Sequence, residues 1–384
     1  MRNSLLHMLK LFSKEMNLLS TICFTWFMVV FCISGLFINF LQLLVIPLYW
    51  LKRDWYHKII PGLAYLIYSQ FTWLGEWWSK VDFKLYVSNL DDIKHFGKEN
   101  SLVISNHYSD VDWLTAWIFA ERVGLIGRTK IISKSETKYL PIIGWCLWFS
   151  ESGFLKRNWQ DDKSNINKLI NSMKRNSNTF SIFVMCEGTR RTDEKLLASQ
   201  EYAVKNNFIP LKHHLFPRTK GFSLLAEALH SKVAAIYDLE FAFPDIESAN
   251  MQNVVNGGKI EVLMHFRRIP MNLVPNSFDG LSNFIIEHYK KKDEIYDHFV
   301  KNKTFPGLRV PLPRRKLNLI FFSIWNIFVS IFALLWLKHC VHLYGQAIVS
   351  TILFLFLFGV YLLFKTMQNY TRTNKGSKFG LKEN

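Results

Sequence analysis

The sequence predicts an α/β domain held between membrane-spanning segments at the two ends of the chain. Long runs without a charged side chain lie near both ends, whereas the middle alternates short β-rich runs with longer helical patterns. Of the 384 residues, 49% are hydrophobic and 16% aromatic, a composition that indicates contact with lipid. The three predicted parts are an anchor over residues 1–79, a folded domain over 80–310 and a C-terminal hairpin over 311–384.

The charge balance predicts an anionic partner for the aqueous part of the chain. Lys and Arg number 47 against 30 Asp and Glu, giving a net charge of +17. Such a charge attracts nucleic acid, an anionic membrane surface or a phosphorylated substrate. The uncharged runs favour the last two, so we expect no nucleic acid partner. The five cysteines form no disulfide framework, and Cys and His do not have metal-ligand spacing, so no metal is expected.

The N-terminal part is predicted to enter the bilayer. Residues 16–51 carry no charge, and about 20 residues suffice to cross the hydrocarbon core. The run is too long for a signal-peptide core. Gly35 and Pro47 could divide it into a span with an interfacial segment, or into two short helices that re-enter the same side. Residues 61–78, rich in Trp and Tyr, predict an interfacial helix beginning at Pro61.

The middle part is predicted to contain strands at residues 102–105, 180–186 and 233–243, where β-branched and aromatic side chains cluster. The first two strands run directly into polar motifs. Active groups gather at the carboxyl ends of strands in α/β folds, so both motifs are candidates for chemistry.

The C-terminal part is predicted to be a transmembrane hairpin. A basic cluster at residues 314–316 precedes two uncharged runs, 317–337 and 341–364, each long enough to span. A short turn containing Lys338 and His339 is expected between them, which returns the chain to the side it left. Basic residues follow the second run at Lys365, Arg372, Lys375 and Lys378. The positive-inside tendency therefore places both flanks, and the middle domain, in the cytosol.

The first polar motif pairs a histidine with an aspartate five residues later. His107 has the intrinsic pKa needed to take a proton from an alcohol at neutral pH. Asp112 could orient the imidazole and stabilise its protonated form if Ser109 or Asp110 caps the following helix. The plainer alternative is a capped helix with His107 as a surface bystander.

The second motif, Glu187-Gly188-Thr189-Arg190, follows the strand at 180–186. A glycine permits a tight turn, and exposed amides beside Arg190 can hold phosphate oxygens through charge-assisted hydrogen bonds. Glu187 could brace an arginine or bind a substrate hydroxyl. Taken alone, this pattern is also typical of an ordinary turn.

A third run places the cations Lys156 and Arg157 beside the apolar Phe154 and Leu155. A lipid with an anionic head group needs such a combination of cations and apolar groups. A solvated basic loop with one packed Phe is the alternative.

Together these motifs resemble the 1-acylglycerol-3-phosphate acyltransferases of the lysophospholipid acyltransferase superfamily. That family has Asn-His, four residues and Asp, matched by Asn106, His107 and Asp112. Its second motif, a Phe with an Arg three residues on, is matched by Phe154 and Arg157. Its Glu-Gly-Thr-Arg motif is complete at residues 187–190, and residues 217–222 and 235–238 look like the eukaryotic endoplasmic-reticulum branch.

The chain departs from the family pattern at three places within the resemblance, which covers residues 103–243. The glycine usual three residues before Phe154 is Glu151 here, the proline often found before Glu187 is Cys186, and the Val-Pro pair of a fourth motif is Val233-Ala234. The departures at Glu151 and Ala234 concern substrate-binding motifs, so they bear on the identity of the acceptor more than on the reaction.

The resemblance implies a glycerol-phosphate acyltransferase-like α/β fold and transfer of a fatty acyl group from acyl-CoA to the sn-2 hydroxyl of lysophosphatidic acid. It implies His107 as general base and Asp112 as its partner. The implied substrate-binding residues are Asn106, Phe154, Arg157, Glu187, Gly188, Thr189 and Arg190. It implies no cofactor beyond acyl-CoA as co-substrate, and a multi-pass protein of the endoplasmic-reticulum bilayer whose catalytic domain faces the cytosol.

Three alternatives remain open from the sequence. The acceptor could be another lysophospholipid, such as lysophosphatidylinositol or lysocardiolipin. The chain could be a catalytically idle membrane-shaping protein, although such a protein has no need of His107 and Asp112. A lipid hydrolase would need a nucleophile, and no Gly-x-Ser-x-Gly motif accompanies the histidine.

Overall fold

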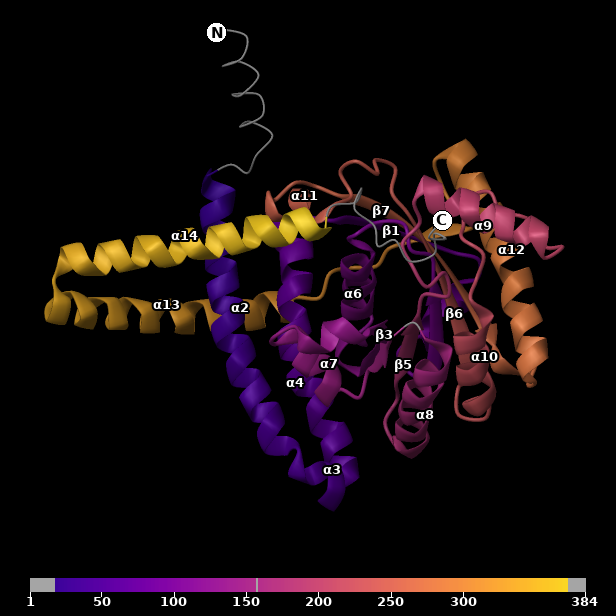
Figure 1. Ribbon diagram of the computed structural model, residues 1–384, viewed down its shortest axis with the longest axis horizontal. Coiled ribbons are helices and arrows are strands. Elements are labelled where there is room, and N and C mark those ends of the chain that lie inside the picture. Colours follow the sequence, from indigo (N-terminus) through magenta and orange to yellow (C-terminus); the bar gives the residue numbers. More distant parts are fainter. Residues whose placement is uncertain (1–17, 157, 372–384) are drawn as a thin grey trace, which may run out of the picture.

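A computed structural model describes residues 18–156 and 158–371, and its centre is an eight-stranded sheet (Figure 1). The strand order is β4-β3-β5-β2-β6-β7-β1-β8. The strands are β1 Asp82–Val87, β2 Ser101–Ser105, β3 Thr129–Lys134, β4 Gly153–Leu155, β5 Ser181–Val184, β6 Ala235–Ala242, β7 Glu261–Pro270 and β8 Leu308–Val310. The predicted α/β fold is confirmed.

The strands that carry the polar motifs are parallel neighbours. β4, β3, β5, β2 and β6 pair in parallel, β7 is antiparallel to β6, β1 is parallel to β7, and β8 is antiparallel to β1. The three strands predicted from the sequence are β2, β5 and β6. Because β2 and β5 are adjacent and parallel, the two polar motifs that follow them emerge side by side at one edge of the sheet.

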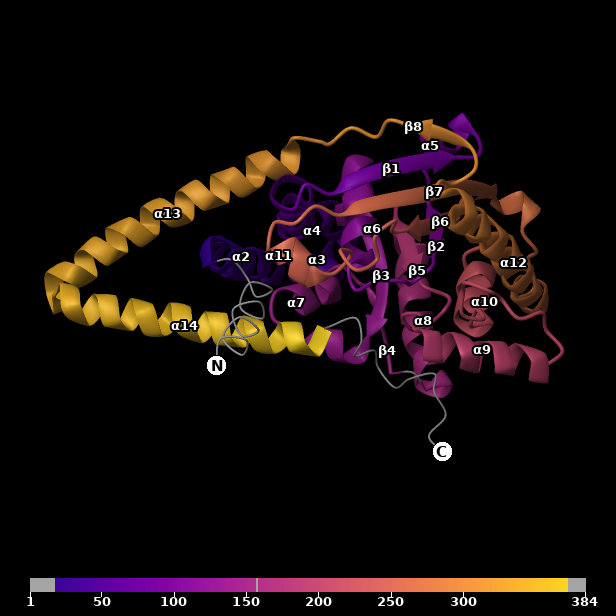
Figure 2. The same ribbon diagram turned by 90° about the horizontal axis from the view of Figure 1, so that it is seen from above.

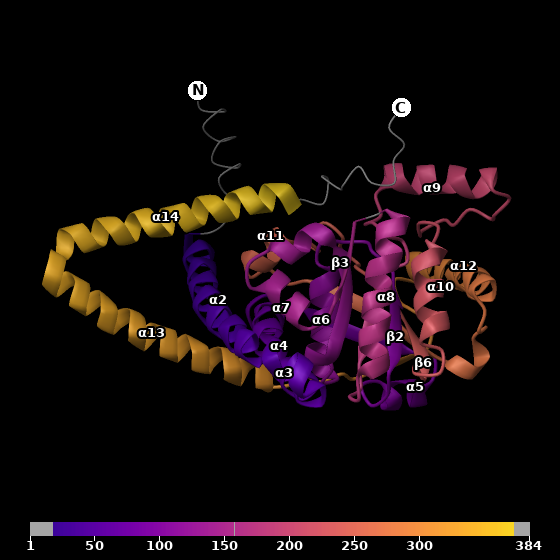
Figure 3. The same ribbon diagram turned by 60° about the horizontal axis from the view of Figure 1, so that its bottom comes forward.

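Helices cover both faces of the sheet (Figures 2 and 3). Val103 packs into the core shared with α6 and the anchor helices, whereas its neighbours Leu102 and Ile104 pack into the core shared with α8, α10 and α12. Successive strand residues point to opposite faces, which explains why Leu102, Val103 and Ile104 are all apolar. The helices of the domain are α5 Leu90–His95, α6 Asp112–Arg122, α7 Ile143–Phe149, α8 Trp159–Arg175, α9 Asp193–Lys205, α10 Thr219–Ala228, α11 Met251–Val255 and α12 Phe278–Asn302.

The uncharged N-terminal run folds mainly as one long helix. α2 (Leu18–Val45) passes through Gly35 without a break. A side chain at residue 35 would collide with Ile142, so glycine allows the helix to approach that residue closely. Pro47 does divide the run, since it begins the short α3 (Pro47–Leu51), where its missing N–H costs no helical bond. Residues 19–51 are long and apolar enough to cross a membrane.

The helix predicted to begin at Pro61 begins earlier, at Arg53, and that part of the prediction was wrong. α4 (Arg53–Trp73) contains Pro61 inside it and continues as a π-helical turn over Leu74–Trp78. The helix runs through the proline because its buried face, formed by Tyr56, Ile60 and Ala64, continues at helical spacing on both sides. α4 thereby joins α2 to the sheet domain, and the two share one hydrophobic cluster.

The C-terminal part forms a pair of long helices that projects from the sheet domain (Figures 1 and 2). α13 (Leu317–Tyr344) leads away from the body and α14 (Gln346–Thr371) leads back toward it. The turn was predicted at Lys338 and His339 but lies at Gly345, whose φ of +79° favours glycine, so both residues belong to α13. α13 is long and apolar enough to span, and together with residues 19–51 it suggests membrane association. Arg372, Lys375 and Lys378 lie outside the described residues.

Candidate active site

The loop between β2 and α6 is anchored to the neighbouring strand by Asn106. Its side-chain Nδ2 donates to the main-chain oxygen of Phe241 at 2.7 Å, and its Oδ1 accepts from the Phe241 N–H at 2.8 Å. Asn106 is fully buried, and both ends of its amide are used. This geometry favours a role in holding the loop on β6 over direct contact with a substrate.

His107 and Asp112 form a hydrogen-bonded pair at the start of α6. The imidazole Nδ1 lies 2.9 Å from Asp112 Oδ2, which also accepts the main-chain N–H groups of Tyr108 at 2.5 Å and Ser109 at 2.8 Å. Asp112 is completely buried, whereas 27% of the His107 side chain is exposed. Asp112 is the first residue of α6, where the helix dipole favours negative charge, and the residue before it, Val111, provides no side-chain cap. The cap therefore comes from neither Ser109 nor Asp110.

Because Nδ1 faces a carboxylate, it carries the proton in neutral His107, which leaves the lone pair on Nε2. An aspartate in this position also stabilises the imidazolium that forms when Nε2 takes a proton. The pair therefore has the parts of a general base and its orienting partner.

His107 forms part of the wall of an apolar cavity of about 200 Å³. The cavity lies between α6 and the strands β2, β3 and β5. Its other lining residues are Phe96, Val103, Trp113, Ala116, Trp117, Phe119, Ala120, Thr129, Ile131, Ile132, Ser181, Phe183, Met185 and Leu239. A cavity lined almost wholly by aromatic and aliphatic groups favours a hydrocarbon chain, and here such a chain would end beside the imidazole.

The turn that contains Glu187, Gly188, Thr189 and Arg190 follows β5 and packs against the His107 loop. The main-chain N–H of Arg191 donates to the His107 oxygen at 2.8 Å, and the His107 N–H donates to Glu187 Oε1 at 3.3 Å. Gly188 has a φ of +69°, which glycine accommodates without strain. Thr189 is buried, and its hydroxyl accepts from Lys195 Nζ at 2.7 Å.

Glu187 lies beneath the catalytic loop rather than at its surface. Only 2% of the residue is exposed. Burial raises the pKa of Glu187 to about 8, although the positive charges of His214 and Lys292 oppose the shift. The carboxyl group is therefore largely protonated at neutral pH. Its hydrogen bond to the His107 main chain favours a supporting role over contact with a substrate hydroxyl.

Two arginines border this turn and give its rim a positive charge. Arg190 is partly exposed and lies close to Asp110. Burial raises the pKa of the Asp110 carboxyl to about 6, although the positive charge of Arg190 acts to lower it. The Arg218 side chain packs against Gly188: a Cβ at residue 188 would lie only 2.7 Å from Arg218 Cδ. Arg218 lies in the segment 217–222 that resembles the family, but its position beside Gly188 has no local signal in the sequence.

The second motif lies at the far edge of the same sheet. Phe154 is on β4, which β3 and β5 separate from β2, so it lies roughly 14 Å across the sheet from the strand that leads to His107. Phe154 packs partly buried against the main core. Arg157 lies outside the described residues. The main-chain N–H of Lys156 donates to Asp162 Oδ1 at 2.6 Å, which fixes the chain just before Arg157.

A buried charge network behind Glu187 was not predicted from the sequence. His214 Nε2 lies 2.8 Å from Glu240 Oε1 and His214 Nδ1 lies 3.0 Å from Asp293 Oδ1, while Lys292 Nζ lies 2.8 Å from Glu240 Oε2. Burial alone would lower the pKa of His214, but Glu240 and Asp293 raise it to about 10. The network thus places charges of both signs close to Glu187: His214 and Lys292 lower its pKa, whereas Glu240 raises it. Within residues 18–156 and 158–371, no group of three or more His, Cys, Asp or Glu side chains is placed to hold a metal ion.

Comparison with known proteins shows similarity along most of the chain. Residues 84–233 match the family model described as Acyltransferase, and residues 253–325 match the one described as Acyltransferase C-terminus. The chain is 34% identical over 304 residues to 1-acyl-sn-glycerol-3-phosphate acyltransferase delta of Bos taurus, covering 79% of this chain and 80% of that protein. It is 34% identical over 296 residues to the gamma protein of Mus musculus, covering 77% of this chain and 78% of that protein.

A more distant likeness is to the crystal structure of the 1-acyl-sn-glycerophosphate (LPA) acyltransferase PlsC from Thermotoga maritima. The TM-score is 0.44 at 17% sequence identity, covering 73% of this chain and 96% of that chain.

Proposed function

Because the chain belongs to the family of 1-acyl-sn-glycerol-3-phosphate acyltransferases, we propose that it transfers a fatty acyl group from acyl-CoA to the sn-2 hydroxyl of lysophosphatidic acid. The product of this reaction is phosphatidic acid. The observation that carries the proposal is the position of His107, whose Nδ1 is held by Asp112 while its ring borders the apolar cavity.

The proposed reaction uses His107 as a general base. The acceptor hydroxyl gives its proton to His107 Nε2 as its oxygen bonds to the thioester carbonyl carbon. The carbon–sulfur bond then breaks, and the imidazolium returns the proton to the departing CoA thiolate. Asp112 stabilises the imidazolium between the two proton transfers. Acyl ester, free CoA and neutral histidine result, so no cofactor is consumed.

The cavity beside His107 supports a site for the fatty acyl chain. A chain that lies among the apolar side chains of α6 and β3 can place its thioester next to the imidazole, which is part of the cavity wall. Burial of apolar surface contributes about 25 cal/mol per Å², so the chain itself supplies much of the binding free energy.

The rim formed by Arg190 and Arg218 supports a site for the acceptor phosphate. A guanidinium binds a phosphate by paired, charge-assisted hydrogen bonds. Exposed arginines beside the Gly188 turn can therefore hold the head group while the acceptor hydroxyl reaches Nε2. Arg157 is proposed to contribute from the second motif.

The proposed location is the endoplasmic-reticulum membrane with the catalytic domain in the cytosol, where acyl-CoA is available. Residues 19–51 and α13 support membrane insertion. The basic cluster at 314–316 precedes α13, and α14 leads back toward the body, which supports a hairpin with both ends on one side.

A transfer assay across acceptors tests the proposed function. Microsomes that contain the chain are given labelled acyl-CoA and, in parallel, lysophosphatidic acid, lysophosphatidylinositol and monolysocardiolipin. We expect the highest kcat/KM with lysophosphatidic acid. A higher value with either of the other acceptors would assign the chain to phospholipid remodelling, and no transfer to any acceptor would contradict the proposed reaction.

A further inference from the structure

The connection between α7 and β4 carries a glutamate in a backbone conformation that favours glycine. Glu151 has a φ of +56° and lies two residues before β4. This is the position at which the family resemblance leads us to expect glycine. A non-glycine residue keeps this conformation only where its surroundings hold it there. The contacts of the Glu151 side chain show what holds it.

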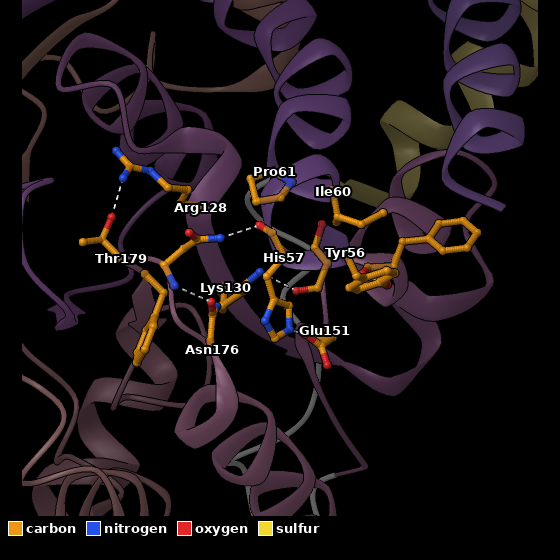
Figure 4. Close-up of a pocket in the computed structure, with 13 residues that line it drawn as sticks. Tyr56, His57, Ile60, Pro61, Arg128, Lys130, Glu151, Asn176 and Thr179 are labelled. Atoms are coloured by element: carbon orange, nitrogen blue, oxygen red, sulfur yellow. Dashed lines mark hydrogen bonds and ion pairs between the residues drawn. The ribbon is translucent and has the colours of Figure 1, made fainter. Parts of the chain in front are cut away.

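The Glu151 carboxylate contacts two basic side chains of helix α4. Its Oε1 lies 2.8 Å from Arg53 Nη2, and its Oε2 lies 2.9 Å from His57 Nε2. Figure 4 shows His57 and Glu151 facing one another across the joint between α4 and the catalytic domain. Only 12% of the Glu151 side chain and 3% of the His57 side chain are exposed, so the pair is shielded from bulk water.

The carboxylate is charged at neutral pH despite its burial. Burial alone would raise the pKa of Glu151, but the hydrogen bond from His57 and the positive charge of Lys130 outweigh it, and the pKa is lowered. Lys130 is buried beside the pair and donates to the main-chain oxygen of Ser150 at 2.7 Å. Three basic side chains thus converge on the loop that leads to β4.

The first turns of α4 also hold the neighbouring backbone. Tyr56 donates its hydroxyl to the main-chain oxygen of Phe149 at 2.5 Å, and the side chain of Asn178 donates to the His57 main-chain oxygen at 2.8 Å. Phe149 leads into β4, and Asn178 leads into β5. The anchor helix therefore contacts the segments that precede β4 and β5. β4 contains Phe154, and β5 leads to the turn at residues 187–190.

The space between these groups is a packed joint and not a ligand pocket. It has a volume of about 10 Å³, which is room for about one water molecule. A small molecule or a lipid head group does not fit there. The ion pairs consequently act on the position of the chain and not on a bound ligand.

We propose that Glu151 is a positioning residue for the acceptor site, because its ion pairs with Arg53 and His57 fix β4 to the membrane anchor. β4 carries Phe154, so its placement sets where this part of the second motif lies. The inference rests on the proposed function, since it assumes that this motif binds the acceptor. Glu151 touches neither substrate and acts through the backbone of β4.

The variant Glu151→Gly tests this role without disturbing the backbone, because glycine adopts a φ of +56° readily. We expect the KM for lysophosphatidic acid to rise about tenfold, since small displacements of a binding group cost one to two orders of magnitude. The KM for acyl-CoA should stay within about twofold of wild type, because no residue of β4 lines the cavity beside His107. Arg53→Gln should also raise the KM for lysophosphatidic acid without raising that for acyl-CoA, and the double variant should be no worse than Glu151→Gly alone.

Glu99→Gln is the matched control. Like Glu151, Glu99 accepts hydrogen bonds from two basic nitrogens, but here both belong to Arg268, at 2.8 and 2.9 Å. Each of the two side chains is 18% exposed. That pair joins the segment before β2 to β7 and does not involve the anchor. We expect Glu99→Gln to lower the Tm and to leave both KM values unchanged.

Three results would overturn the inference: an unchanged acceptor KM in Glu151→Gly, an equal rise in both KM values, or additive losses in the double variant. If Glu151→Gly fails to fold, Arg53→Gln and His57→Gln decide the question, because they leave the loop sequence intact. A wild-type chain that acylates no lysophospholipid contradicts the proposed function instead, so the two failures are distinguishable.

Discussion

His107 Nδ1 lies 2.9 Å from Asp112 Oδ2, and the same carboxylate oxygen accepts two main-chain N–H groups of the intervening loop. These bonds fix the aspartate, and the aspartate fixes the imidazole. The local chain therefore sets both the tautomer of His107 and the direction of Nε2 before any substrate arrives. Such preorganisation lowers the cost of placing a base at the reacting hydroxyl.

Asp112→Asn should lower kcat by about two to four orders of magnitude, with much smaller changes in either KM. Asparagine keeps the shape but has no negative charge to stabilise the imidazolium. Initial rates at saturating acyl-CoA and acceptor measure the effect. Asp91→Asn serves as a control, because Asp91 is exposed and pairs with Lys94 at the surface. A kcat within threefold of wild type would remove Asp112 from the mechanism.

Arg190→Ala and Arg218→Ala should each raise the KM for lysophosphatidic acid by about tenfold or more, because a hydrogen bond to a charged group contributes about 1.5–3 kcal/mol. The KM for acyl-CoA should change less. Arg157→Ala is predicted to act in the same direction to a smaller degree. Arg309→Ala, an exposed arginine on β8, should leave both constants unchanged. Variants that weaken only acyl-CoA would show that these arginines bind the donor.

Glu187→Gln should change how stability depends on pH. The pKa of Glu187 is raised by burial from 4.5 to about 8, so the folded chain holds this proton more tightly than the unfolded chain. The free energy of unfolding therefore falls as pH rises between these values, and glutamine removes this loss. Thermal unfolding in detergent from pH 5 to 9 should show the Tm of wild type decreasing relative to the variant up to about pH 8. A Tm difference that is constant over this range would contradict a protonated Glu187.

The hairpin can be tested with the chain's own glycosylation sequons. Asn302 is the last residue of α12 and precedes the hairpin in the sequence. Asn369 lies near the end of α14, the second helix of the hairpin. If both flanks are cytosolic, neither asparagine should carry glycan in a eukaryotic host. An acceptor site in a loop lengthened at Gly345 should be glycosylated, because that turn would then reach the lumen. Endoglycosidase-sensitive glycan on Asn302 would place the catalytic domain in the lumen.

The sequence alone predicted three strands in which most side chains are aliphatic or aromatic. β2, β5 and β6 lie between two helical layers, and their apolar residues are visible locally, although β6 also carries the buried Asp238 and Glu240. β7 was missed because it carries Arg267 and Arg268, whose partners Asp238 and Glu99 lie 29 and 169 residues away along the chain. A charged strand of this kind is recognisable only once its partners are known.

In the candidate site, too, contacts between residues close in sequence were predictable and contacts between distant residues were not. The proximity of His107 and Asp112 follows from five residues of spacing, whereas the roles assigned to both stay predictions. The burial of Glu187 depends on α12 and β6, and His214 meets Asp293 across 79 residues of sequence. No local pattern marks such contacts. The hairpin turn at Gly345 was missed for a simpler reason, because Lys338 and His339 are polar but still helical.

The most direct test of the account is acyl transfer by His107→Ala. Labelled acyl-CoA and lysophosphatidic acid are supplied to microsomes that contain equal amounts of wild type or variant, and insertion is checked by resistance to alkaline extraction. The account predicts that the variant inserts normally and loses about two to four orders of magnitude in kcat. Turnover close to wild type in a normally inserted His107→Ala chain would contradict it.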